Sequence, residues 1–396
     1  MKVEVKSKAT GSSFQVDRII GEYSQNIPGP ILIFIGGIHG NEPSGVISLK
    51  QVFDELHQLK PPIKGRIYGF AGNLTALSKC LRFVQSDLNR TWKIERMKEI
   101  SNGKYTPENE SIEGREQKEL YDAIKKIIQN NHDVYIFDLH TTSSESQPFI
   151  TIGDTLRNRL FAMKFPIPII LGIEEQIEGT LLSYINSEFG FTTMGFESGQ
   201  HNALSSIQIH KALIWLVLLH TKCIKSNDIP NLNEHHQTLV SYARDNQKIF
   251  EIRYRYDISK LKEFKMNPGF QNFQRINKGE SLAKSEFGDI SSLEKGMVFL
   301  PLYQEQGDDG FFVVRQIMPF WLKVSAFLRK IRVDKILPIL PGIKKHPDAE
   351  NTLVVNTKIA RWYVIELFHL LGFRKEMRIN GKLIVAKRKY DTIKPH

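Results

Sequence analysis

The stretch ILIFIGGIHGNEPSG, residues 31–45, joins a five-residue apolar run to a glycine-rich turn that carries a histidine and a glutamate. The apolar run, residues 31–35, predicts a buried central strand. Apolar residues then recur at helical spacing from residue 46 to residue 56, which predicts a helix directly behind the turn. A strand followed by a helix is the repeating unit of an α/β domain.

The same alternation continues on the C-terminal side of this stretch. We expect further strands at residues 66–73, 134–139, 149–152 and 193–197. We expect helices around residues 120–128 and 205–223, where apolar side chains again follow helical spacing. Residues 1–225 are therefore predicted to form one α/β domain.

The sequence pattern changes twice beyond residue 225. A polar stretch, residues 225–236, is the predicted linker, and KIFEIRYRYDI, residues 248–258, alternates with the period of an antiparallel strand. Glycines punctuate short strand-like runs as far as residue 320, which predicts a β domain over residues 226–320. After a proline-rich connector, a helix near residues 358–371 and a hairpin turning at Asn380-Gly381 predict an α/β appendage over residues 321–396.

Length and composition exclude several classes of protein. The chain has 396 residues, of which 41% are hydrophobic and 24% charged, as in globular proteins of two or three domains. Cys80 and Cys223 are its only cysteines, so no disulfide framework is expected and a reducing compartment is favoured. The first residues lack the apolar core of a signal peptide, and no apolar run approaches the ~20 residues of a membrane-spanning helix. We therefore expect a soluble, cytoplasmic protein.

The net charge of +11 is concentrated in the C-terminal part of the chain. Residues 321–396 hold 17 Lys and Arg against 6 Asp and Glu, whereas residues 1–320 hold 37 of each sign. A basic region of this kind is typical of proteins that bind nucleic acid or an anionic membrane surface. A solvated lysine-rich face is the simpler interpretation, and we favour it. On this view the appendage lies apart from the functional site.

Three metal-ligating side chains follow two of the expected strands. His39 and Glu42 form the only His-x-x-Glu pair of the chain and lie three residues apart on the turn, where they can converge on one ion. His140 follows the strand at residues 134–139, and open α/β sheets bind ligands at the carboxyl ends of their strands. Alone, His140 would be read as a strand-end histidine with local hydrogen bonds. Two imidazoles and one carboxylate together predict a single catalytic zinc with one position left for water.

Two further carboxylates lie at strand ends. Glu197, in TTMGFESGQ, is a candidate general base and acid, because a carboxylate beside an activated water can take its proton and pass it to a leaving nitrogen. Asp138 precedes His140 by two residues and therefore points to the same side of the strand. It is either a group that orients a ligand or a buried structural carboxylate.

The segment KCLRFVQSDLNR, residues 79–90, places Arg82, Asn89 and Arg90 in one short loop. The planar guanidinium of arginine suits bidentate binding of a carboxylate. The loop therefore predicts a binding site for an anionic group, although a solvated arginine pair beside an Asn turn would have the same sequence.

The ordered motifs HGNEPSG, RFVQSDLNR, DLH and GFESG resemble those of the succinylglutamate desuccinylase and aspartoacylase family, part of the zinc carboxypeptidase superfamily. The resemblance covers residues 28–225 strongly and extends loosely to about residue 320. It implies a carboxypeptidase-like mixed sheet with helices on both faces, followed by a small β domain that shapes the cleft.

The resemblance also implies a role for each motif residue. His39, Glu42 and His140 match the zinc ligands, and Glu197 matches the catalytic glutamate. At the substrate, the matching groups are Arg82, which polarises the scissile carbonyl, and the Asn89-Arg90 pair, which holds a carboxylate.

Two departures from the aspartoacylase branch concern the substrate. That branch has an arginine shortly before the catalytic glutamate, but residues 181–196 contain neither Arg nor Lys. The branch also has a tyrosine after an Asn-Glu, where this chain has LYQEQGDDGFF, with Tyr303 displaced and Asp308-Asp309 in its place. These differences indicate that the side chain of the substrate need not be acidic, which admits neutral or apolar side chains.

We therefore expect a zinc-dependent hydrolase that cleaves the amide of an N-acyl amino acid or of a related small molecule bearing a carboxylate. A zinc carboxypeptidase acting on peptides is the alternative within the same class, because its substrate also presents a carboxylate near the scissile amide. A non-catalytic protein that binds polyanions through residues 321–396 is the alternative from another class. The intact set of ligands and Glu197 weigh against it.

Overall fold

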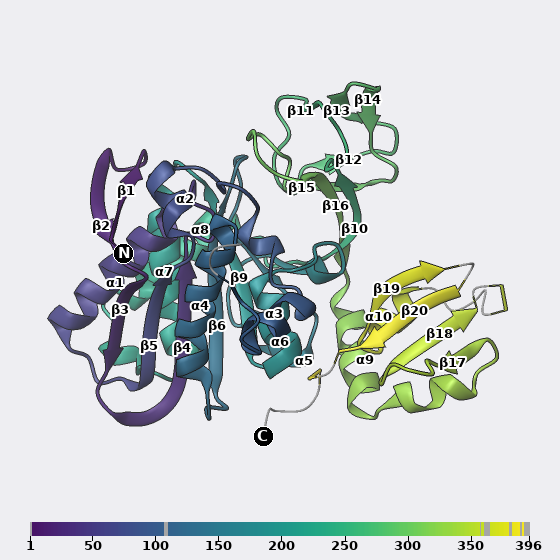
Figure 1. Ribbon diagram of the computed structural model, residues 1–396, viewed down its shortest axis with the longest axis horizontal. Helices are drawn as coiled ribbons and strands as arrows, with labels where there is room; N and C mark the ends of the chain where they lie inside the picture. Colours follow the sequence, from purple (N-terminus) through teal and green to yellow (C-terminus); the bar gives the residue numbers. More distant parts are fainter. Residues whose placement is uncertain are drawn as a thin grey trace.

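The computed structural model describes residues 2–106, 110–356, 358–359, 365–379, 382–388 and 390–391. Its central feature is an eleven-stranded mixed sheet with the order β12-β15-β16-β10-β8-β7-β9-β6-β4-β5-β3 (Figure 1). Helices cover both faces of the N-terminal half of this sheet. The predicted fold class, a mixed sheet with helices on both faces, is confirmed.

Four neighbouring strands of the sheet are parallel, and together with β7 (Phe149–Ile152) beside β9 they account for the strands expected within residues 1–225. The four parallel strands are β5 (Lys64–Ala71), β4 (Ile27–Gly36), β6 (Val134–Thr142) and β9 (Thr192–Gln200). The register pairs His140 of β6 with Glu197 of β9. These two residues are therefore neighbours at the carboxyl edge of the sheet.

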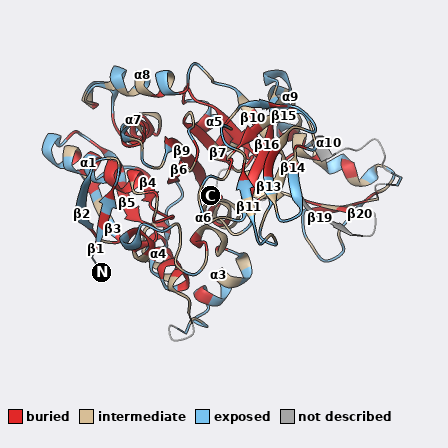
Figure 2. Ribbon diagram, turned by 90° about the horizontal axis from the view of Figure 1, so that it is seen from above, coloured by how far each residue is buried: buried red, intermediate tan, exposed pale blue. Residues whose placement is uncertain are grey.

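Alternate residues of β4 pack into two different cores. Leu32 and Phe34 contact the layer formed by α1 (Ser44–Leu59) and α7 (Leu204–His220). Ile33 and the residues two positions before and after it contact the layer of α4 (Ile112–Ile128) and α6 (Leu181–Phe189). Because both faces of the strand are covered, its sequence is a continuous apolar run. Figure 2 shows the buried residues concentrated along these central strands.

The other elements of the N-terminal part surround this core. They are β1 (Val3–Ser7), β2 (Ser12–Val16), β3 (Ile19–Ser24), α2 (Leu74–Lys79), η1 (Leu88–Arg90), α3 (Ile94–Ser101), β7 (Phe149–Ile152), α5 (Leu156–Ala162), β8 (Ile169–Leu171) and η3 (Ile173–Glu175).

The strands of residues 226–320 continue the central sheet. After α8 (Leu232–Tyr242), strand β10 (Ile249–Asp257) pairs in parallel with β8 and antiparallel with β16 (Asp309–Ile317). Strands β15 (Gly296–Phe299) and β12 (Arg275–Ile276) complete that edge. A separate three-stranded sheet holds β11 (Phe264–Met266), β13 (Ser281–Ser285) and β14 (Gly288–Ser291). The period of two thus predicted β10 correctly, while the domain boundary at residue 226 stays a prediction.

Residues beyond 318 form a unit with its own core and a four-stranded antiparallel sheet. Its elements are α9 (Pro319–Lys330), η5 (Val333–Ile339), β17 (Ile343–Lys345), β18 (Thr352–Asn356), α10 (Ile365–Leu370), β19 (Phe373–Ile379) and β20 (Lys382–Lys387). Strands β19 and β20 pair as the predicted hairpin would, and its turn at Asn380-Gly381 lies outside the described residues. Among the described helices of the chain, none has the length and apolar content needed to cross a membrane.

Candidate active site

Three buried side chains converge where β4 and β6 end. His39 and Glu42 come from the turn between β4 and α1, and His140 comes from β6. One ligand atom from each lies within 4.8 Å of the other two. Nδ1 of His39 is 2.8 Å from Glu42 Oε1, and Nδ1 of His140 is 3.2 Å from Glu42 Oε2. The three residues singled out in the sequence are thus brought together, and their donor set fits a zinc ion.

The Nε2 atom of each histidine faces a carboxylate. His39 Nε2 lies 3.1 Å from Asp87 Oδ1, and His140 Nε2 lies 2.8 Å from Asp138 Oδ2. A carboxylate behind a metal-binding imidazole fixes the orientation of its ring and raises its basicity. Asp138 therefore has the geometry of an orienting group, one of its two interpretations from the sequence. Asp87 belongs to the quoted loop, but sequence reasoning missed it.

Burial raises the pKa of Glu42, but the neighbouring His39 and His140 outweigh this effect and hold its pKa well below the usual range. The backbone N–H of Thr141 also donates to Glu42 Oε2 at 2.8 Å. Glu42 is consequently held as an ionised carboxylate, which is the form that binds a metal.

Asp87 connects the triad to Arg82. Arg82 Nη2 donates to Asp87 Oδ2 at 2.9 Å, and Arg82 Nη1 lies 3.7 Å from Glu42 Oε1. Burial raises the pKa of Asp87, yet Arg82 and His39 hold it well below its usual range. Arg82 is thereby fixed as a cation at the edge of the triad.

A close backbone contact sets the distance between the turn that carries His39 and the loop that carries Arg82. The N–H of Gly40 donates to the carbonyl of Arg82 at 3.1 Å. A Cβ atom at position 40 would lie 2.0 Å from the backbone of Ala76 in α2, the helix just before the Arg82 loop. Only glycine therefore allows the turn that carries His39 to approach the Arg82 loop so closely.

Glu197 lies next to His140 on the adjacent strand and lines the same pocket. Among the residues that the structure describes, its Oε2 has no hydrogen-bond partner. Burial raises the pKa of Glu197 to about 8, with His140 opposing and Glu42 adding to the shift. A carboxyl group with a pKa near neutrality suits transfer of a proton in either direction.

Asn89 and Arg90 also line the pocket, but each has a partner within the protein. Asn89 Oδ1 accepts the N–H of Leu181 at 3.0 Å. Arg90 Nη2 is paired with Oδ2 of Asp309 at 2.8 Å, and the same carboxylate also binds Arg255. Arg82, in contrast, points to Asp87. The loop therefore supplies two separate cationic positions, where the sequence had predicted one cluster of all three residues.

The segment at residues 300–307 crosses the site and is tied to both sides of it. Gln304 Oε1 accepts from Asn41 Nδ2 at 2.8 Å and lies 3.0 Å from Nε2 of His201. Gln306 Oε1 accepts the N–H of Arg82 at 3.1 Å. His201 and Gln304 both line the pocket. They were not singled out from the sequence, because these contacts join segments about 100 or more residues apart.

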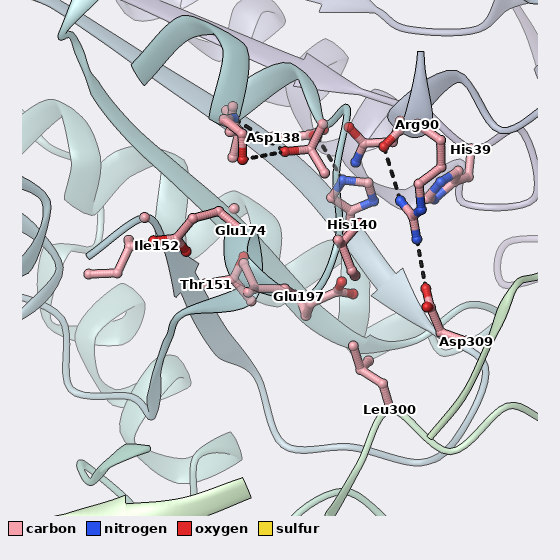
Figure 3. Close-up of a pocket in the computed structure, with 18 of the residues that line it drawn as sticks. His39, Arg90, Asp138, His140, Thr151, Ile152, Glu174, Glu197, Leu300 and Asp309 are labelled. Atoms are coloured by element: carbon pink, nitrogen blue, oxygen red, sulfur yellow. Dashed lines mark hydrogen bonds and ion pairs between the residues drawn. The ribbon is translucent and has the colours of Figure 1, made fainter. Parts of the chain in front are cut away.

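The pocket is a cavity of about 330 Å³ that runs from the triad past Glu197. Figure 3 shows His39, Arg90 and Asp309 at one end in this view and Thr151, Ile152 and Glu174 at the other. Lys387 and Arg388 from the C-terminal unit line it as well. The expectation that residues 321–396 lie apart from the site is therefore wrong, because charge composition does not reveal where a unit packs.

The fold and the site agree with comparisons to known proteins. Residues 28–216 match the family model of the succinylglutamate desuccinylase/aspartoacylase catalytic domain. These residues belong to that family. Within it, an N-acyl-aromatic-L-amino acid amidohydrolase (carboxylate-forming) of Xenopus laevis is 25% identical over 64% of this chain and 86% of its own length. The aspartoacylase of Mus musculus is 32% identical over 34% of this chain and 40% of its own length.

A solved structure of the same family shares the fold. The crystal structure of a succinylglutamate desuccinylase/aspartoacylase from Rhodobacter sphaeroides superposes with a TM-score of 0.55 at 16% identity. The match covers 80% of this chain and 94% of that one. The fold of most of the chain is thus that of the succinylglutamate desuccinylase/aspartoacylase family.

Proposed function

We propose that this protein hydrolyses the amide bond of N-acyl amino acids with the help of one zinc ion. The observation that carries the proposal is the buried His39, Glu42 and His140 triad beside Glu197 in a cavity large enough for a small molecule. His39, Glu42 and His140 would hold the ion. When bound, zinc polarises a carbonyl and lowers the pKa of a coordinated water towards ~7. The family of residues 28–216 supports this chemistry.

Glu197 is the proposed proton carrier. It takes a proton from the attacking water and delivers it to the nitrogen of the leaving amino acid. Its free Oε2 atom and the pKa of about 8 caused mainly by burial support both halves of this transfer. The neighbouring position of His140 in the register brings Glu197 next to the place where the water would be held.

The two cations of the Arg82–Arg90 loop have separate tasks. Arg82, held by Asp87 and adjacent to the triad, stabilises negative charge that develops on the carbonyl oxygen. Arg90 and the amide of Asn89, on the other side of the loop, hold the carboxylate of the amino acid. The position of Arg82 beside Glu42 of the triad and the pairing of Arg90 with Asp309 support this division.

The side chain of the amino acid is proposed to be neutral and mainly apolar. Residues 181–196 offer no Arg or Lys, and the cavity beyond Glu197 is lined by Ile152, Ile173, Ile177 and Leu182. The Xenopus laevis relative, named for N-acyl-aromatic amino acids, is consistent with such a substrate.

The test is a hydrolysis assay of the zinc-loaded protein on a panel of N-acetyl and N-succinyl amino acids, with short peptides as the competing class. Release of free amino acid from the acylated panel, and none from the peptides, is the expected result. Glu197→Gln should keep its zinc and fold but lose about 100-fold or more in kcat. Turnover of peptides alone would assign the protein to the carboxypeptidases. Normal turnover by Glu197→Gln would remove this residue from the mechanism.

A further inference from the structure

The C-terminal unit is bound to the catalytic domain through buried ion pairs. Arg329 has a fully buried side chain whose nitrogens lie 2.9 Å from Asp154 of the catalytic domain and 2.9 Å from Asp391. Arg388 Nη2 pairs with Glu174 at 2.9 Å and with Glu175 at 2.7 Å. Breaking a buried pair leaves an uncompensated charge, so these contacts fix the unit in place.

Docking of this unit brings two of its side chains to the wall of the catalytic cavity. Lys387 and Arg388, at the end of β20, line the same cavity as His39 and Glu197. Between these two ends the wall combines apolar with polar and charged side chains, and we call this part the inner compartment. Its lining residues are Thr151, Ile152, Ile173, Glu174, Ile177, Leu182, Asn186, Lys387 and Arg388.

Glu174 lines the inner compartment and has one carboxylate oxygen without a partner among the described residues. Its Oε1 accepts from Asp154 N at 3.0 Å and from Arg388 Nη2 at 2.9 Å. Its Oε2 is buried and, within the described part of the chain, has no hydrogen-bond partner. The Glu174 side chain is only 9% exposed, so water does not readily compensate this oxygen. A buried acceptor without a partner in a binding cavity indicates a place for a donor of the ligand.

The charges around this oxygen favour a neutral donor over a cationic one. Arg388 and Lys387 are both cations at the same end of the cavity, and each is paired with carboxylates, Lys387 with Asp334. An ammonium group placed beside Glu174 would lie close to the guanidinium of Arg388, which the same carboxylate already binds at 2.9 Å, and this like-charge contact should weaken its binding. A hydroxyl or ring N–H adds no charge there.

The inner compartment adjoins the place proposed for the substrate carboxylate. Asn89 Oδ1 accepts the N–H of Leu181, the first residue of α6. The next residues of this helix, Leu182 and Asn186, line the inner compartment. A group attached to the carbon that bears the carboxylate is therefore the part of the substrate closest to this compartment.

We infer that the inner compartment binds the side chain of the substrate amino acid, and that Glu174 selects an aromatic side chain with a neutral hydrogen-bond donor at its far end. A phenol or an indole has this chemistry. The inference rests on the proposed function for the identity of the substrate. According to this inference, the C-terminal unit contributes to substrate specificity, because its Arg388 positions Glu174.

Binding measurements separate this inference from the catalytic proposal. In a Glu197→Gln background, we expect N-acetyl-L-tyrosine to bind about 10- to 100-fold more tightly than N-acetyl-L-phenylalanine by calorimetry, the range for a hydrogen bond to a charged acceptor. N-acetyl-L-lysine should bind more weakly than both. Adding Glu174→Gln should reduce the preference for tyrosine to less than about threefold while leaving the affinity for the phenylalanine compound unchanged.

Glu175→Gln is the matched control. It removes a carboxylate from the same arginine, but Glu175 lines a neighbouring cavity on the other side of η3 and not the inner compartment. The preference for tyrosine should survive in this variant. Equal affinities for the tyrosine and phenylalanine compounds in the parent protein would overturn the inference, even if hydrolysis of both is observed. Tighter binding of compounds that carry the phenol on the acyl group, and not on the amino acid side chain, would also overturn it. If the catalytic proposal is wrong, the result is different: the protein hydrolyses neither compound but still binds the tyrosine compound more tightly.

Discussion

The carboxylate of Asp309 lies 2.8 Å from the guanidinium of Arg90, so the arginine proposed to hold a substrate carboxylate already has an acidic partner. Asp309 begins β16, more than 200 residues after Arg90 in the chain. The same carboxylate binds Arg255 of β10. Two cations and one anion leave a single positive charge for the substrate.

Asp309→Asn should lower the KM for N-acyl amino acids by up to about tenfold, because it removes a negative charge close to the substrate carboxylate. Methyl esters of the same compounds, which carry no charge at this position, should keep their KM. Steady-state kinetics on acid and ester pairs measures both. A KM that rises for the acids would show instead that Asp309 positions Arg90.

Asp87→Asn should weaken zinc binding by about 10- to 100-fold, since Asp87 orients His39 from behind. The same change should lower kcat, because Arg82 loses its main partner. Competition with a chelator measures the first effect. Asp54→Asn, which removes a carboxylate from an exposed pair with Lys50, is the control and should change neither. Unchanged zinc affinity in Asp87→Asn would exclude the orienting role.

His39→Ala, Glu42→Ala and His140→Ala should each lose the zinc found in the parent protein, because three protein ligands are the minimum of a catalytic site. Elemental analysis after dialysis gives the metal content per chain. His57→Ala, on the exposed surface of α1, should keep one zinc per chain. Full metal content in all three ligand variants would disprove the assignment.

Arg329→Met should reduce the free energy of unfolding by about 3–5 kcal/mol, because it leaves the buried Asp154 and Asp391 without their shared cation. Thermal and denaturant unfolding measure the loss. Lys345→Met removes a positive charge from an exposed position of the same unit and should have little effect. Equal stability of the two variants would mean that the ion pairs do not hold the unit in place.

Acid should destabilise the protein partly through His210. Burial lowers the pKa of this histidine to about 3, and its Nδ1 lies 3.2 Å from the hydroxyls of Ser44 and Ser198. Because the unfolded chain binds the proton at about pH 6.5, stability is fully present above that pH and falls as the pH drops towards 3. The loss through this one group is about 2 kcal/mol at pH 5. Between pH 5 and 7, the free energy of unfolding should depend less on pH in His210→Gln than in the parent protein. His57→Gln should show the same pH dependence as the parent.

The residues predicted correctly to lie together are those with local signals. His39 and Glu42 share a turn, and His140 and Glu197 lie near the carboxyl ends of strands whose apolar runs are visible in the sequence. Strand ends of a parallel sheet meet at one edge, so their proximity could be predicted without the structure.

Other parts of the site depend on contacts that no local pattern reveals. Asp309 reaches Arg90, and Arg388 reaches Glu174, only because β16 joins the central sheet and the C-terminal unit docks on η3. The basic composition of residues 321–396 predicted a solvated face, yet Arg329 and Arg388 are buried in ion pairs. Composition records charge, but burial depends on which surface meets which.

The docked C-terminal unit also has a consequence for how the protein is made. Chains fold from the N-terminus as they leave the ribosome. Asp154 and Glu174 are therefore synthesised long before Arg329 and Arg388, and during that interval these carboxylates have no cation from the C-terminal unit. The nascent catalytic domain would contain the metal triad and Glu174 before Arg388 has emerged. A chain interrupted before β20 would keep both of these without the guanidinium that holds Glu174 in position.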